Sequence, residues 1–146
     1  MKTLVLVDVQ NDFTPGGSLQ VPGGDGIIDP VNKIQNRFDL VVATQDWHPP
    51  GHVSFASNHE GKEPFEVIDL DGREQTLWPD HCVQGSEGAR LHPRLELSRV
   101  EAIFRKGMDR EIDSYSAFYD NGHLKSTGLA GYLREKGAGE LHFAGL

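Results

Sequence analysis

Short, valine-rich apolar segments restrict the fold of this chain more than any other feature. Residues 4–9 and 40–44 are almost entirely aliphatic, which is typical of strands buried on both faces of a sheet. Residues 102–104 and 141–146 predict two further strands. Strands of this kind belong to parallel sheets that helices cover on both sides.

Helical segments are expected between these strands. Asp29 and Pro30 predict an N-cap followed by proline at the first helical position, and Val31 begins an apolar stripe with helical spacing. A second helix is expected from Ser126, with Gly137 as its C-cap, whereas residues 52–92 show no clean period. Alternating strands and helices predict an α/β domain with a mostly parallel sheet.

Length, charge and cysteine content exclude several classes of protein. The chain has 146 residues, which suits a single domain over residues 1–146, and a net charge of −8. That charge argues against nucleic acid or an anionic membrane as a partner, because both require a basic surface. The first apolar run stops at Asp8, too early for a signal peptide or a membrane span. With Cys82 as the only cysteine, we expect a soluble protein of the reducing cytoplasm.

Charged and metal-binding side chains follow three of the predicted strands. Asp8 lies near the end of the first, Asp46 and His48 close the second, and Lys106 follows the third. Parallel α/β sheets bind their ligands beyond the carboxyl ends of the strands. The sequence therefore predicts a functional site at this edge of the sheet.

Asp46 and His48 are the candidates for a metal site. They are two residues apart on an extended segment, so their side chains project to the same side. A carboxylate and an imidazole supply two of the three ligands of a typical catalytic divalent-metal site. Spacing alone leaves the third ligand open among His52, His59 and His81. The structural alternative is that the aspartate caps a turn and the histidine stacks on the adjacent tryptophan.

Asp8 and Lys106 are the candidates for proton transfer. A buried aspartate is costly unless it is paired or functional, and a desolvated lysine can orient or activate a nucleophile. For an isolated lysine at a strand end, exposure to solvent is the simpler interpretation. Cys82 follows His81 directly, but neighbouring side chains diverge, so we expect this thiol to be a packing residue rather than a nucleophile.

Five blocks of the sequence resemble the signature blocks of nicotinamidases, which belong to the isochorismatase-like cysteine hydrolases. The blocks are residues 7–13 (VDVQNDF), 44–52 (TQDWHPPGH), 78–85 (WPDHCVQG), 104–107 (FRKG) and 113–118 (DSYSAF). Their order and spacing are similar to those of the family over residues 4–146. The resemblance implies a three-layer, Rossmann-like α/β fold.

The resemblance implies hydrolysis of nicotinamide, and of pyrazinamide in some members, to the acid and ammonia as a step of NAD salvage. It also implies one divalent metal, zinc before iron or manganese, which accepts the ring nitrogen directly or through water. The residues that match the family's site are the general base Asp8, the catalytic lysine Lys106, the metal ligands Asp46, His48 and His81, the more variable ligand His52, the ring-sandwiching Phe13 and Trp78, and the pocket-lining Tyr115.

The family's nucleophile is a cysteine a few residues beyond a strand that ends in Gly-Leu or Gly-Ile, and this sequence stops at Gly145-Leu146. We therefore expect these residues to be a nicotinamidase portion that lacks the thiol and the last strands and helices, and that is inactive alone. The alternative is a non-catalytic module that binds metal or nicotinamide; hydrolysis by a metal-bound water ranks last. The open edge of strand 141–146 predicts poor solubility, self-association or pairing with a complementary chain.

Overall fold

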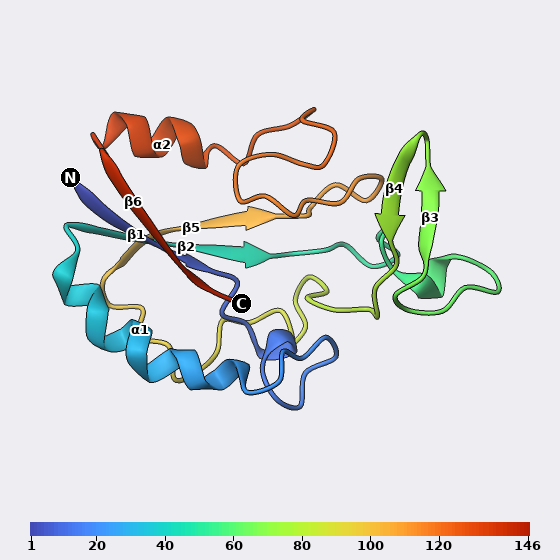
Figure 1. Ribbon diagram of the computed structural model, residues 1–146, viewed down its shortest axis with the longest axis horizontal. Helices are drawn as coiled ribbons and strands as arrows, with labels where there is room; N and C mark the ends of the chain where they lie inside the picture. Colours follow the sequence, from blue (N-terminus) through green and yellow to red (C-terminus); the bar gives the residue numbers. More distant parts are fainter.

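The chain forms a four-stranded sheet, a two-stranded hairpin and two α-helices (Figure 1). The computed structural model describes residues 1–146. In chain order the elements are β1 (Lys2–Val7), the 3-10 turns η1 (Asn11–Phe13) and η2 (Gly24–Ile27), α1 (Ile28–Ile34), η3 (Gln35–Arg37), β2 (Leu40–Asp46), η4 (Ala56–Asn58), β3 (Val67–Leu70), β4 (Arg73–Thr76), β5 (Val100–Lys106), α2 (Leu129–Glu135) and β6 (Glu140–Gly145).

The main sheet is entirely parallel. Its strand order is β5-β2-β1-β6, with β1 paired to both β2 and β6. Figure 1 shows α1 on one side of this sheet and α2 on the other. The predicted three-layer α/β arrangement with a mostly parallel sheet is confirmed.

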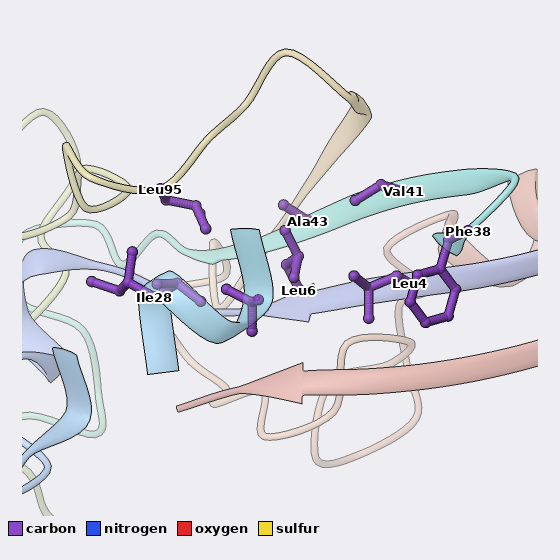
Figure 2. Packing of buried hydrophobic residues seen from close by; sticks show 9 residues of the cluster. Leu4, Leu6, Ile28, Phe38, Val41, Ala43 and Leu95 are labelled. Carbon is purple, nitrogen blue, oxygen red and sulfur yellow. The ribbon is translucent and has the colours of Figure 1, made fainter. Parts of the chain in front are cut away.

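Two hydrophobic cores explain why residues 4–7 of β1 are all apolar. Leu4 and Leu6 point to one face of the sheet, where they pack with Ile28 of α1 (Figure 2). Val5 points to the other face and packs with Leu129 of α2. Because both faces of the strand are covered, the sequence shows a continuous apolar run rather than an alternation.

The expected element boundaries needed correction at several places, three of which have a clear physical reason. β1 ends at Val7 rather than at residue 9, because Asp8 has a φ of 50° and leaves the strand. Asp29 is not the N-cap of α1, since η2 leads directly into a helix that begins at Ile28. α2 begins at Leu129 rather than at Ser126, after a residue with a φ of 88°.

Residues 52–92 contain regular structure that the sequence did not predict. β3 and β4 form an antiparallel hairpin whose turn is Asp71-Gly72, both residues having positive φ. The Asp-Gly pair is a typical hairpin signal. β3 has three aliphatic residues and β4 has four polar ones, so the two strands share no alternating pattern that would have marked them. As for membranes, none of the helices combines the length and the apolar character needed to cross one.

Candidate active site and metal centre

The candidate functional site lies where three adjacent parallel strands end. Lys106 is the last residue of β5 and Asp46 is the last residue of β2, and the two are paired in register. Asp8 directly follows β1, the next strand in the sheet. The topology thus brings three charged side chains, far apart in sequence, to one point.

Lys106 bridges the two carboxylates. Its Nζ lies 2.8 Å from Asp8 Oδ2 and 3.0 Å from Asp46 Oδ1, and it donates a hydrogen bond to the carbonyl oxygen of Ser114 at 3.3 Å. The contact with Asp46 is ionic only, because Oδ1 has no hydrogen-bond donor of acceptable geometry. The side chain of the lysine is 6% exposed. The solvated lysine considered as the simpler interpretation is therefore wrong.

Burial and charge shift the protonation equilibria of the three groups in different directions. Burial lowers the pKa of Lys106, but the two carboxylates overcome this effect and raise it above its ordinary value. Burial raises the pKa of Asp46, yet the ammonium and two imidazoles hold it well below the usual range. For Asp8, burial prevails over the ammonium and the pKa is raised, although Thr44 Oγ1 donates to it at 2.6 Å. Asp8 is thus the carboxylate that takes up a proton more readily.

Two histidines approach Oδ2 of Asp46, the carboxylate oxygen that Lys106 does not contact. His48 Nε2 lies 3.0 Å and His81 Nε2 3.4 Å from Asp46 Oδ2. Their Nδ1 atoms lie 2.9 Å from the carbonyl oxygen of Gly107 and 2.7 Å from that of Pro79, respectively. Because a carbonyl accepts only, each Nδ1 carries the proton in the neutral ring, and each Nε2 presents a lone pair.

This donor set fits a divalent metal. Two imidazole nitrogens converge on a carboxylate oxygen, an arrangement that a metal cation between them would stabilise. The three ligand atoms lie within 4.8 Å of one another, and all three residues are buried. One carboxylate and two imidazoles are suitable ligands for zinc, iron or manganese.

His52 and His59 do not join this cluster. His52 Nδ1 lies 2.7 Å from Ser54 Oγ, and its Nε2 faces the carbonyl oxygen of Ile112 at 3.3 Å. Burial and the neighbouring His48 lower the pKa of His52 to about 4. It belongs instead to a second group, with His48 and Asp113, whose possible ligand atoms also lie within 4.8 Å of one another. His59 binds the carbonyl oxygen of residue 53 at 2.7 Å.

The structural alternative for His48 is also wrong. Its ring packs against His52 and Phe55, with centroids 4.2 and 5.5 Å away. Trp47 instead lies under the guanidinium of Arg105, 3.9 Å from the ring centroid.

A cavity of about 170 Å³ opens beside the charged triad of Asp8, Asp46 and Lys106. It is lined by the aromatic side chains of Phe13, Trp78 and Tyr115 and by acidic, basic and imidazole groups. The remaining lining residues are Asp8, Leu19, Asp46, His81, Lys106, Asp113 and Ser114. The structure thus brings every residue of the expected site except His48 and His52 to one cavity, and His48 adjoins the cavity through its contact with Asp46. A second cavity of about 140 Å³ shares Lys106 and Ser114 but contains neither the aromatic residues nor the imidazoles.

Cys82 is a packing residue, as expected. It is fully buried, and its Sγ accepts a hydrogen bond from Gln10 Nε2 at 3.3 Å. Burial, with three nearby carboxylates, raises the pKa of this thiol far above its ordinary value. A thiol of this kind is not a nucleophile at neutral pH.

Sequence analysis missed several buried polar residues around the site. Gln10, Thr44 and Asp113 are at most 4% exposed. Each hydrogen-bonds a residue or segment of the site: Gln10 bonds Asp46, Thr44 bonds Asp8, and Asp113 bonds the backbone N–H of Ser114. The available signal was their position within or beside the five sequence blocks.

Comparisons with known proteins agree with this geometry. The model of the isochorismatase domain family matches residues 2–146. A nicotinamidase of Acinetobacter baylyi is 54% identical over 98% of this chain and 67% of its own length. The solved structure of a nicotinamidase and pyrazinamidase from Acinetobacter baumanii has a TM-score of 0.97 and 51% identity, covering 99% of this chain and 70% of that one. A pyrazinamidase of Pyrococcus horikoshii solved in complex with zinc has a TM-score of 0.75 and 34% identity, covering 99% and 70%. The chain belongs to the isochorismatase family.

Proposed function

We propose that this protein is a nicotinamidase, which hydrolyses nicotinamide, and also pyrazinamide, to the corresponding acid and ammonia. The observation that carries the proposal is the buried Asp8–Lys106 pair beside the Asp46–His48–His81 cluster, on a cavity walled by aromatic side chains. Relatives that share about half of its residues are nicotinamidases. NAD salvage and a cytoplasmic location belong to the same proposal.

A cavity lined by aromatic and by charged side chains suits a small, flat heteroaromatic amide. Phe13 and Trp78 line the cavity and offer ring faces to a pyridine or pyrazine. A divalent metal, which we propose is zinc, would be held by Asp46, His48 and His81 and would supply a Lewis acid toward a ring nitrogen. His52 is not part of the proposed ligand set.

Asp8 acts as the general base of the proposed reaction. It accepts the proton of a cysteine thiol that is not among residues 1–146, and the thiolate sulfur then forms a bond with the amide carbon. The carbon–nitrogen bond breaks as the amide nitrogen takes a proton from Asp8 and leaves as ammonia. Water then cleaves the thioester, giving the acid and restoring the thiol. Lys106 keeps Asp8 oriented and offsets negative charge near the reacting atoms.

A module that only binds metal or nicotinamide is the competing function. The buried triad favours the enzyme, because three desolvated charges cost folding free energy that a binding module has no evident reason to spend. Since the only thiol among the 146 residues is buried and protonated, we expect these residues alone to release no ammonia.

Ammonia release from nicotinamide by the natural full-length protein tests the proposal. We expect release to fall at least a hundredfold in Asp8→Asn, which cannot accept the proton, and to persist in Cys82→Ala. Nicotinamide binding without ammonia release would favour the binding module. Loss of activity in Cys82→Ala would point to Cys82 as the nucleophile and would contradict the proposed mechanism.

A further inference from the structure

The turn of residues 10–13, which consists of Gln10 and η1, contacts every segment that carries a proposed metal ligand. It begins three residues after β1 and ends at an aromatic wall of the cavity. Two of its side chains, those of Gln10 and Asp12, do not line the cavity but point into the protein toward the ligand segments.

The side chain of Gln10 hydrogen-bonds both the backbone N–H and the backbone carbonyl oxygen of Asp46. Its side-chain Oε1 accepts the backbone N–H of Asp46 at 2.8 Å, and its Nε2 donates to the carbonyl oxygen of Asp46 at 2.8 Å. The same Nε2 donates to the carbonyl oxygen of Ala89 at 2.8 Å. Gln10 has no exposed surface, so no water can replace these partners.

Asp12 holds the segment that carries His81. Its Oδ2 accepts the backbone N–H of Cys82, the next residue, at 2.7 Å, and Cys82 has a φ of 46° that favours glycine. The carbonyl oxygen of Cys82 in turn accepts the backbone N–H of His48 at 2.9 Å. A Cβ atom on Gly88 would lie 2.1 Å from Asp12 Oδ2, so the fit around this carboxylate is tight.

We propose that Gln10 and Asp12 are positioning residues that hold Asp46, His48 and His81 at metal-binding distances. Neither touches the metal position, the substrate cavity or the reacting atoms. This inference rests on the proposed metal site. The three ligands come from two segments that are far apart in the sequence. Hydrogen bonds from the turn of residues 10–13 hold these segments at a fixed spacing.

Zinc affinity of the natural full-length protein, measured by competition with a chromophoric chelator, tests the inference. Gln10→Met keeps the shape of the side chain but removes its hydrogen bonds, and Asp12→Asn replaces one of two acceptors by a donor. We expect each variant to bind zinc about 10- to 100-fold more weakly. Asn11→Ala is the matched control: it removes an exposed hydrogen bond from the same turn to Glu87, and its zinc affinity should equal that of the wild type.

The absorption spectrum of the cobalt-substituted protein provides a readout that does not depend on stability. We expect altered d–d bands in both variants and unchanged bands in the control. If Gln10→Met does not fold, Asp12→Asn and Gln10→Glu carry the test. Wild-type affinity and spectra in the folded variants would overturn the positioning role and leave the proposed function intact. A wild-type protein that binds no zinc would overturn the metal site and this inference with it.

Discussion

Replacing Lys106 by methionine removes the only cation between two buried carboxylates while keeping the length of the side chain. The ammonium contacts Asp8 and Asp46 at 2.8 and 3.0 Å, and the side chains of all three residues are at most 7% exposed. Breaking a buried ion pair costs about 3–5 kcal/mol. We therefore expect a large loss of unfolding free energy at neutral pH.

Protonation of one carboxyl group limits this loss and makes it depend on pH. Protonating a carboxyl with an ordinary pKa near 3.8 costs about 4 kcal/mol at pH 7 and about 2 kcal/mol at pH 5. In Lys106→Met the folded-state pKa of that carboxyl lies above the unfolded value, so stability falls as pH rises toward the folded pKa. In the wild type the pKa of Asp46 is depressed instead, and its contribution is lost only as pH falls through that low pKa.

Guanidinium chloride unfolding with a chelator present, between pH 5 and pH 7.5, measures this difference. We expect the variant to be destabilised by about 4 kcal/mol at pH 7 and by about 2 kcal/mol at pH 5. Lys136→Met is the control, because that lysine pairs with Glu101 at the exposed surface and should cost less than about 1 kcal/mol. A loss below about 1 kcal/mol in Lys106→Met, or a loss that does not shrink toward pH 5, would refute the electrostatic reasoning.

Two further substitutions test the cavity and the metal cluster. In steady-state assays, Trp78→Ala should raise KM for nicotinamide about tenfold with a smaller change in kcat, because it removes a ring contact of about 1 kcal/mol or more. Trp47→Ala is the control: this residue lies outside the cavity, and its replacement should leave KM unchanged. Gly107→Ala should weaken zinc binding in the chelator competition about tenfold or more, because the new Cβ would lie 2.4 Å from His48 Cε1 and the residue has a φ of 66°. Gly26→Ala is the control: its Cβ would have no atom within 4 Å, and zinc binding should be unchanged.

The sheet and the site edge could be predicted from sequence because their signals are local. Strands buried on both faces produce apolar runs, and parallel strands bring the residues that follow them to one edge. Asp8, Asp46 and Lys106 are predictable on this basis, because each ends or follows a strand of the same sheet. The same local reasoning placed the N-cap of α1 at Asp29, because it could not foresee that η2 would continue directly into the helix.

Partners contributed by distant segments could not be predicted in this way. Spacing could not decide among His52, His59 and His81, since the choice depends on where a long irregular segment folds back onto β2. Residues 81 and 46 meet through the backbone bonds of Cys82 and the side chains of the turn η1, which no periodicity reveals. Even for Lys106, burial depends on the Ser114 segment that covers it.

Anomalous diffraction at the zinc edge, from crystals of the full-length protein grown with zinc and nicotinamide, tests the central claim most directly. We expect one strong peak bounded by Asp46 Oδ2, His48 Nε2 and His81 Nε2, with the pyridine ring between Phe13 and Trp78. A peak between His52 and Asp113, the other buried cluster, or a ring bound outside this cavity would contradict the account.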